Sequence, residues 1–207
     1  MLGAGILLIH LSLAIFGSAL APYPPNEFHY EDALQSPSST YLFGTDEYGR
    51  DVFSRVLSGA RSIVIIAFLA TVIGVALGTI LGLLAGYYGG FGGEVTMRFV
   101  DAAMSFPSLL LALLILTVVG SSTLNIIVCV AVLFIAPVTR IIRSVALELR
   151  PQQYILAAQA RGERSTYIIF KEILPNAVAP IIVECSIRVS YAVLIAASLG
   201  FLGLGVQ

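Results

Sequence analysis

Two charged side chains lie inside a long apolar run in the last part of the sequence. Glu184 and Arg188 are four residues apart, so on a helix they would face each other across one turn. Ionisable groups at membrane depth are rare, and they usually face the interior of a helix bundle or a water-filled cavity. The pair therefore indicates either an ion pair buried between helices or a polar patch on a translocation path, and the sequence leaves both interpretations open.

The residue types that usually carry catalysis or bind metal ions are scattered. His10 and His29 are far apart, and Cys129 and Cys185 lie in separate apolar runs. The sequence contains no GxxxxGK(S/T) loop, no HExxH motif and no GxSxG motif. We therefore expect no catalytic residue, no metal ligand and no cofactor in this chain, and we expect that it is not an enzyme.

The composition is typical of a chain surrounded by lipid. Hydrophobic residues make up 58% of the sequence and charged residues 11%, whereas soluble domains have about 45–50% and about 25%. A chain this apolar cannot cover its surface with polar groups, so we expect a membrane protein. The net charge of -1 argues against a nucleic acid partner.

The apolar runs predict an all-α, polytopic bundle of transmembrane helices. A spanning helix needs about 20 mostly apolar residues. We expect five such helices, at Leu2–Leu20, 62–86, about 104–119, about 125–140 and 177–198. The third and fourth divide one uncharged run that is too long for a single span, and Pro137 is expected to kink or end the fourth.

The distribution of Lys and Arg predicts which loops face the cytoplasm, because cytoplasmic loops carry an excess of these residues. The loop at 21–61 holds Arg50, Arg55 and Arg61. The loops around 87–101 and at 140–176 together hold Arg98, Arg140, Arg143, Arg150, Arg161, Arg164 and Lys171. The latter two are therefore predicted to be cytoplasmic and the first extracytoplasmic, with the N-terminus inside and residue 207 outside.

The first apolar segment has a second interpretation. Residues 2–21 are short and apolar and end in GSALAP, with small residues where a signal peptidase would cut. The segment lacks the basic stretch that normally begins a secretory signal. A first transmembrane helix is the preferred interpretation.

Four glycines recur at every fourth residue of the second predicted span. Gly74, Gly78, Gly82 and Gly86 would lie along one helix face. Small residues at this spacing let two helix backbones approach closely in lipid. We expect this face to pack against another helix of the bundle rather than to line a pore.

The segment YILAAQARGERSTYIIFKEILPN at 154–176 interrupts the apolar runs. Pro151 suits the first position of a helix over 152–161, and Gly162 suits its end. A second helix, about 165–173, would lead into Leu174-Pro175-Asn176 and the last span. One face of the first helix is small in its middle, so another protein could approach it; this face comprises Tyr154, Ala157, Ala158 and Arg161. The alternative is an ordinary surface loop with conventional caps.

This segment resembles the EAA loop of ABC importer permeases, in which E-A-A is followed three residues later by Gly and then by a stretch ending in hydrophobic-Leu-Pro. The matching residues are Ala157, Ala158, Gly162, Ile173, Leu174 and Pro175. Leu156 stands where the family has Glu. The resemblance implies a coupling helix that docks on an ATPase subunit, with Tyr154, Ala157, Ala158, Arg161, Gly162 and Glu163 at the contact.

A second resemblance narrows the family. FGTDEYGRDVFSRVLSGAR at 43–61 is similar to the LGTDxxGRDxxSRxxxGAR segment of C-type permease subunits of dipeptide, oligopeptide and nickel ABC importers. MRFVDAAMSFPSLLLAL at 97–113 and SLGFLGLGVQ at 198–207 also look like that subunit, so the resemblance covers about 40–207. The family has six spans, which places the expected sixth span beyond Gln207 in a type I importer permease fold.

The physics of 43–61 agrees with a surface segment. Asp51 suits the N-cap of a helix that follows it. Arg50, Arg55 and Arg61 are expected to pair with Asp46, Glu47 and Asp51. The segment is then a self-satisfied interfacial helix, a docking platform for a soluble binding protein, or both. The docking residues would be Asp46, Arg50, Asp51 and Arg55.

The resemblance also implies an assembly in the bacterial cytoplasmic (inner) membrane. Its expected partners are a second, B-type permease, two cytoplasmic ATPase subunits that carry ATP and Mg, and an extracytoplasmic substrate-binding protein. Di- or oligopeptides are the expected cargo, and nickel is the alternative. A less favoured class is a channel or ion-coupled secondary transporter, with Glu184 and Arg188 as the coupling site.

Two parts of the chain are expected to differ in role. Residues 1–61 would contain the first span and an extracytoplasmic loop with an interfacial helix. Residues 62–207 would form the core permease domain, with its cytoplasmic coupling loop at 144–176.

Overall fold

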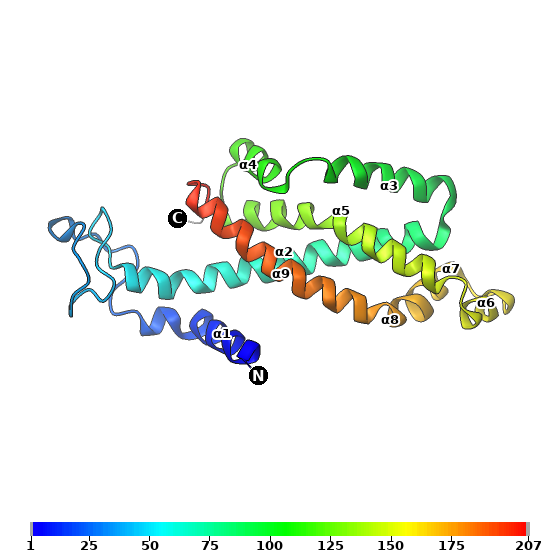
Figure 1. The fold of residues 1–207 in the computed structure, drawn as a ribbon, viewed down its shortest axis with the longest axis horizontal. Coiled ribbons are helices and arrows are strands. Elements are labelled where there is room, and N and C mark those ends of the chain that lie inside the picture. The colour runs from blue at the N-terminus through cyan, green and yellow to red at the C-terminus, as the bar shows by residue number, and fades with distance from the viewer. Residues whose placement is uncertain (1, 206–207) are drawn as a thin grey trace. The chain divides into compact units, whose positions relative to one another are not determined.

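The computed structural model describes residues 2–205, and the regular elements of that part of the chain are helices (Figure 1). The chain divides into two compact units, Met1–Ile65 and Ile66–Gln207. The elements are α1 (Leu2–Leu20), η1 (Tyr30–Asp32), α2 (Val52–Tyr88), α3 (Gly90–Met104), α4 (Ser108–Val119), α5 (Thr123–Leu149), α6 (Gln153–Ala160), α7 (Ser165–Tyr167), the π-helix η2 (Ile168–Ile173), α8 (Leu174–Asn176) and α9 (Val178–Phe201). The predicted all-α architecture is confirmed.

In the first unit, α1 packs against the beginning of α2 through small side chains. A Cβ atom on Gly17 would lie 2.3 Å from the carbonyl oxygen of Leu57, so only glycine allows this approach. Ala14, one turn earlier, is buried as well. Most other side chains of α1 are apolar and exposed, as expected for a helix that faces lipid.

In the second unit, the glycine face of α2 packs directly on α5. A Cβ atom on Gly74, Gly78 or Gly82 would lie within 2.9 Å of α5 atoms from Ala131 to Ile142, and one on Gly86 would lie 2.5 Å from the Cβ of Ala146. The predicted helix packing is therefore confirmed, and the partner helix lies in the same chain.

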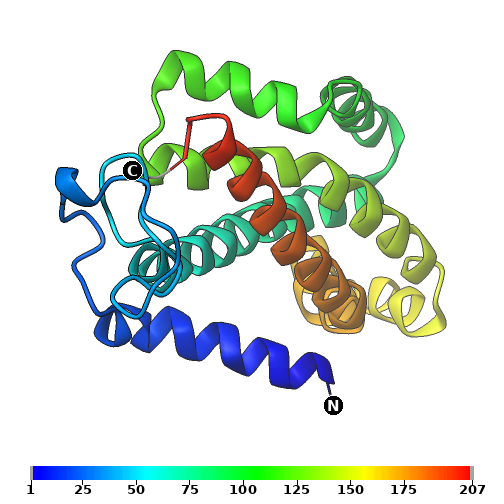
Figure 2. The same ribbon diagram turned by 60° about the vertical axis from the view of Figure 1, so that its left-hand side comes forward.

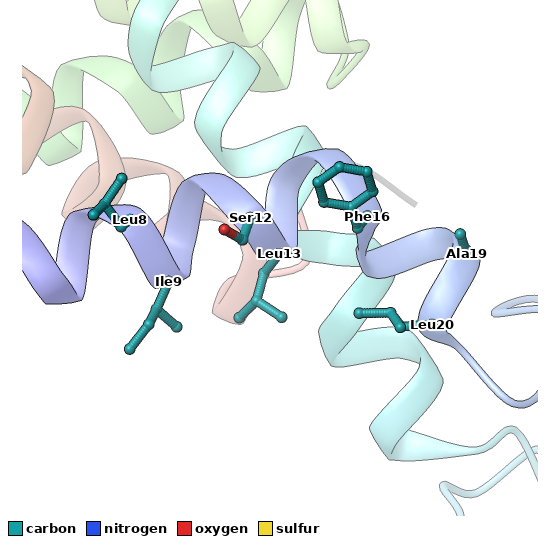
Figure 3. Close-up of a pocket in the computed structure, with 7 residues that line it drawn as sticks. All are labelled: Leu8, Ile9, Ser12, Leu13, Phe16, Ala19 and Leu20. Carbon is teal, nitrogen blue, oxygen red and sulfur yellow. The ribbon is translucent and has the colours of Figure 1, made fainter.

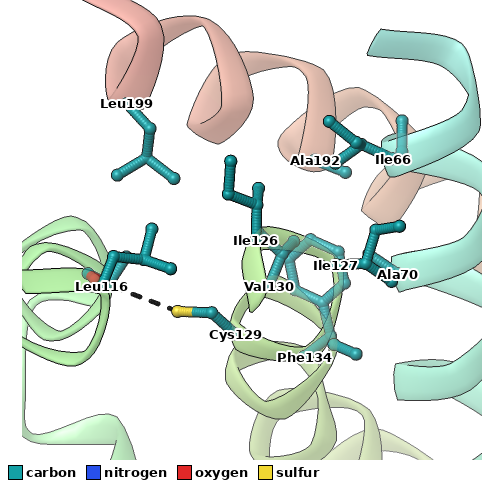
Figure 4. Packing of buried hydrophobic residues seen from close by; sticks show 13 residues of the cluster. Ile66, Ala70, Leu116, Ile126, Ile127, Cys129, Val130, Phe134, Ala192 and Leu199 are labelled. Atoms are coloured by element: carbon teal, nitrogen blue, oxygen red, sulfur yellow. Dashed lines mark hydrogen bonds between the residues drawn. The ribbon is translucent and has the colours of Figure 1, made fainter. Parts of the chain in front are cut away.

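One of the two hydrophobic clusters in the second unit is formed by side chains of α2, α4, α5 and α9 (Figure 4). Leu116, Ile126, Val130 and Leu199 are almost completely buried there. The Sγ of Cys129 lies 3.9 Å from the carbonyl oxygen of Ala112, which joins α5 to α4. Figures 1 and 2 show α9 crossing α5 on the side away from α3. Volume changes at these positions should be costly, because close-packed cores relax only partly.

Three helices in the described chain are long and apolar enough to cross a membrane: α2, α5 and α9. The helices α3 and α4 bend by 84° at their junction; they form either one broken span, which would be a fourth crossing, or a re-entrant loop. The 12-residue α4 is too short for the single span predicted at 104–119. Pro107 explains the break, because it lacks an N–H and disfavours helical geometry in the preceding residue. The count of five spans stays a prediction.

The helices α2 and α5 are both longer than the apolar spans predicted within them. The helix α2 begins at Val52, directly after the predicted N-cap Asp51, and continues without a break through the predicted span at 62–86. Pro137 lies inside α5 without ending it. A proline removes one backbone hydrogen bond, and packed neighbouring helices tolerate this loss. The helix α5 therefore extends to Leu149, well past the apolar run.

Candidate functional site

The short helix α6 begins and ends close to where the sequence predicted. Its last turn closes with two hydrogen bonds, from Gly162 N to Gln159 O (2.9 Å) and from Glu163 N to Ala158 O (3.2 Å). This is a Schellman motif, and Gly162 takes the required left-handed conformation at φ +77. A residue with a side chain would be strained at this position.

The orientation of α6 differs from the prediction. Ala158 was expected on an exposed small face, but Ala158 and Ile155 are both completely buried. They belong to a cluster that also contains Leu83 from α2 and Ile142 from α5. The exposed side of α6 instead carries Tyr154, Leu156 and Ala157. Ala158 therefore anchors α6 to the spans and cannot touch another protein directly.

The segment after Gly162 is helical, as predicted, but its middle is a π-helix. Pro175 cannot donate a hydrogen bond to the carbonyl of Lys171, so the preceding turn cannot close as a regular α-helix. The i→i+5 pattern of η2 (Ile168–Ile173) accommodates this break. The side-chain amide of Asn176 donates to the carbonyl oxygen of Glu172 (2.6 Å), which satisfies one acceptor at the irregular turn. The Leu-Pro-Asn motif thus has a structural explanation.

In the first unit, Asp46 organises the segment at 43–61. Its Oδ1 accepts from the backbone N–H groups of Tyr48 (2.9 Å) and Arg50 (3.0 Å), and its Oδ2 lies 2.7 Å from the Nε of Arg50. The Nε of Arg55 lies 3.8 Å from the same oxygen. Burial alone would raise the pKa of Asp46, but these hydrogen bonds and the Arg50 charge hold it below its usual value. The predicted pairing is confirmed for Arg50 and Arg55.

Asp51 caps α2, as predicted. Its carboxylate accepts from the backbone N–H of Ser54 (2.9 Å) and from the hydroxyl of Ser54 (2.6 Å). Only 4% of Asp51 is exposed, so this residue cannot contact a docking protein. Its inclusion in the predicted docking surface was wrong. Asp51 and Glu47 form no ion pair with any of the three arginines within residues 2–205.

An aromatic cluster that the sequence did not predict lies on the loop between α1 and α2. The rings of Phe28 and Tyr30 stack with centroids 5.7 Å apart, and the edge of Tyr48 lies near Phe28. The guanidinium of Arg50 lies 4.8 Å from the centroid of Tyr48 and 5.5 Å from that of Phe28. Because all three rings remain exposed, they form an apolar surface on this loop. Tyr48 and Arg50 are too far from Phe28 and Tyr30 in the sequence for spacing to reveal the cluster.

Beneath that surface, the loop is held by a polar contact. Tyr41 is buried, and its hydroxyl donates to Oδ2 of Asp32 (2.8 Å). This hydrogen bond, with further contributions from burial and from the charge of Asp32, raises the pKa of Tyr41 to about 12. The side-chain amide of Gln35 donates to the other Asp32 oxygen (2.6 Å). The loop is therefore a folded platform rather than a loose connection.

Glu184 and Arg188 form an ion pair on α9. The Nη2 and Nε of Arg188 lie 2.9 Å and 3.1 Å from the same Glu184 oxygen. The exposed fractions of the side chains are 6% for Glu184 and 13% for Arg188. The guanidinium lies 5.7 Å from the ring centroids of both Phe134 and Tyr191. The geometry agrees with a compensated buried pair, since breaking one partner would leave a buried charge.

Together these features define a multi-pass helical membrane protein. It has an anchored short helix, α6, in its basic loop region and a folded polar turn at the start of α2. The comparisons with known proteins agree with this class. Residues 78–207 match the family described as "Binding-protein-dependent transport system inner membrane component".

Three relatives illustrate the similarity. The dipeptide transport system permease protein DppC of Alkalihalophilus pseudofirmus is 40% identical over 205 residues, which are 99% of this chain and 67% of the relative. The glutathione transport system permease protein GsiD of Pectobacterium atrosepticum is 38% identical, with 97% and 67% covered. GsiD of Escherichia coli O1:K1 is 40% identical, with 100% and 69% covered. The chain belongs to the family of binding-protein-dependent inner membrane transport components and is an ABC importer permease.

Proposed function

We propose that this chain and a second permease subunit form the transmembrane path of an importer for di- or oligopeptides in a bacterial inner membrane. The relatives described above are named for dipeptide and glutathione transport, which favours peptides over nickel as cargo. The family assignment replaces the alternative of a channel or an ion-coupled carrier. ATP and Mg would be bound by separate ATPase subunits.

The observation that carries the proposal is the anchoring of α6. Ile155 and Ala158 are completely buried in a cluster shared with α2, α5 and η2. A push on the exposed side of α6 would therefore move the spans with it, because close-packed interiors transmit displacement. In this proposal Tyr154, Ala157, Arg161, Gly162 and Glu163 form the ATPase contact, and Ala158 transmits the motion.

The remaining sites have distinct roles in the proposed cycle. A substrate-binding protein would dock on the extracytoplasmic platform, where Arg50 and Arg55 are held by Asp46. ATP binding would move α6 and alternate the access of the path between the two sides. Glu184 and Arg188 would hold α9 in one packing arrangement beside this path.

The test is a bulky substitution on the exposed side of α6. We expect Ala157→Trp to lower ATP-driven uptake of a labelled dipeptide by about tenfold or more, since a clash at an interface hot spot costs about 2 kcal/mol. Uptake would be measured in proteoliposomes that contain the complete transporter and its binding protein. Recovery of the ATPase subunits with the permease would be measured by affinity purification.

The matched control is Ala103→Trp, a change at an exposed alanine of α3 outside the coupling loop. It should leave uptake and ATPase recovery near the levels of the unmodified protein. Normal uptake by a well-inserted Ala157→Trp permease would contradict the assignment of α6 as the coupling helix. Normal ATPase recovery with lost uptake would move the defect from docking to transmission.

A further inference from the structure

Among the three arginines of the segment at 43–61, Arg61 is the one that has no ion-pair partner within the described residues. Arg50 and Arg55 both contact Asp46, but Arg61 forms no ion pair or side-chain hydrogen bond within residues 2–205. Its side chain is exposed, one turn beyond the small contact between Gly17 and Leu57. A guanidinium keeps its charge in proteins, so this group requires water or an anion.

The position of Arg61 along α2 places it at the membrane surface. Residues 62–86 are uncharged, and α2 runs through them without a break to Tyr87 and Tyr88. At 1.5 Å per residue this stretch is about 37 Å long. The hydrocarbon core is about 30 Å thick, and about 40–45 Å with the headgroup regions. If the two tyrosines lie at one interface, Arg61 lies at the headgroup level of the other.

A groove lies directly beside Arg61 between α1 and α2. The close contact of the two helices leaves space on its flank, and aliphatic side chains cover the walls of this space. The groove is lined by Leu11, Ala14, Ile15, Arg61, Val64 and Ile65. Arg61 is its one charged residue. The site thus combines a cation at headgroup depth with a hydrocarbon surface.

We propose that Arg61 and this groove bind one anionic phospholipid of the extracytoplasmic leaflet. The phosphodiester would accept hydrogen bonds from the Arg61 guanidinium, whose planar array of donors matches two phosphate oxygens. An acyl chain would lie against Leu11, Ile15 and Val64. Lipid suits this groove better than a soluble anion, because the walls offer no other polar side chain.

The absence of tryptophan from the chain allows a direct test. Ile15 lines the groove and is 68% exposed, so Ile15→Trp would place a fluorophore there with little effect on packing. Phe16 is the matched control position, because it lies at nearly the same depth in a separate apolar groove of α1 (Figure 3). That groove contains no charged residue: it is lined by Leu8, Ile9, Ser12, Leu13, Phe16, Ala19 and Leu20.

Each variant permease would be reconstituted with its partner subunits in phosphatidylcholine vesicles containing a small fraction of phosphatidylglycerol. In one series the phosphatidylglycerol acyl chains carry bromine, which quenches nearby tryptophan, and in the other the phosphatidylcholine carries it. Subtracting the signal of the transporter without an added tryptophan removes the contribution of other subunits. The ratio of quenching in the two series gives the preference of the site for the anionic lipid.

We expect Ile15→Trp to show preferential quenching by brominated phosphatidylglycerol, and Phe16→Trp to show bulk behaviour. Adding Arg61→Gln should weaken the preference at Ile15→Trp about fivefold, as expected for loss of one basic residue near the surface. Arg61→Lys should retain part of it. Equal quenching by both lipids with Arg61 present would overturn the proposal. Loss of quenching by both would also overturn it and would indicate that another protein covers the groove.

Discussion

At the scale of single residues, the Asp46 carboxylate stabilises the turn before α2 through both of its oxygens. One oxygen accepts from two backbone N–H groups, and the other lies between Arg50 and Arg55. Gly49 closes the same turn at φ +74, and a Cβ there would lie 1.8 Å from the carbonyl oxygen of His29. The turn therefore depends on one acid and one glycine more than on its other residues.

Asp46→Asn should loosen this turn by about 1 kcal/mol, because the amide keeps the backbone contacts but loses the charge that faces Arg50 and Arg55. Asp46→Ala should loosen it further, since the backbone donors also lose their acceptor. Hydrogen exchange of residues 44–51 in the reconstituted transporter would measure both changes. Equal protection in Asp46→Ala and the unmodified protein would contradict this role.

The same carboxylate predicts an acid-sensitive turn. The pKa of Asp46 lies below its ordinary value of 3.8 in the folded protein, so the unfolded turn binds a proton more readily. The stabilisation is therefore complete above about pH 3.8 and is lost as the pH falls through the lowered pKa. Exchange in the unmodified turn, corrected for its intrinsic pH dependence, should accelerate in that range. The Asp46→Asn turn should show no such step.

At the scale of elements, the irregular turn between α6 and α9 sets how the two helices are connected. A π-helix turns less per residue than an α-helix, so η2 changes the direction in which α9 presents its side chains. Pro175 prevents this segment from relaxing to a regular helix, and Asn176 satisfies the carbonyl of Glu172. The helices α6 and α9 are therefore joined at a defined rotation.

Pro175→Ala should let the segment return to α-helical geometry and rotate α6 relative to α9. We expect dipeptide uptake per ATP hydrolysed to fall about 2- to 30-fold, the range for changes in a coupling element. Pro180→Ala is the matched control, because Pro180 lies in the first turn of α9, where a missing N–H costs little. Unchanged coupling in Pro175→Ala would show that the π-helix is not needed for transmission.

Sequence reasoning worked for elements whose pattern is local. The four-residue spacing of Gly74 and its repeats defines a helix face whatever the partner is, so the close packing was predictable. The orientation of Ala158 was not predictable from the sequence. The cluster around Ile142 and Leu83, which are distant in sequence, decides which face of the eight-residue helix α6 is buried. The same limit applies to Phe28 and Tyr48, which meet only when the loop folds.

At the scale of the whole molecule, the bent pair of α3 and α4 decides the orientation of everything that follows. The first of the three long spans, α2, carries the chain from the acidic loop to the opposite side. If α3 and α4 cross once as a broken span, α5 ends with its basic residues on the cytoplasmic side. If they re-enter instead, α5 runs the other way and α6 faces outward. The excess of Lys and Arg in 140–176 favours a single crossing.

Cysteine labelling separates these two topologies. In a chain whose native cysteines are replaced by alanine, Glu47→Cys and Ser121→Cys should react with a membrane-impermeant maleimide in intact cells, and Gln159→Cys only after permeabilisation. Ser121 precedes α5 and Gln159 lies on the exposed side of α6, so both report the crossing by α3 and α4. Protection of Ser121→Cys together with outside labelling of Gln159→Cys would establish re-entry. Such a result would remove α6 from the side where ATP is available and would rule out its proposed contact with the ATPases.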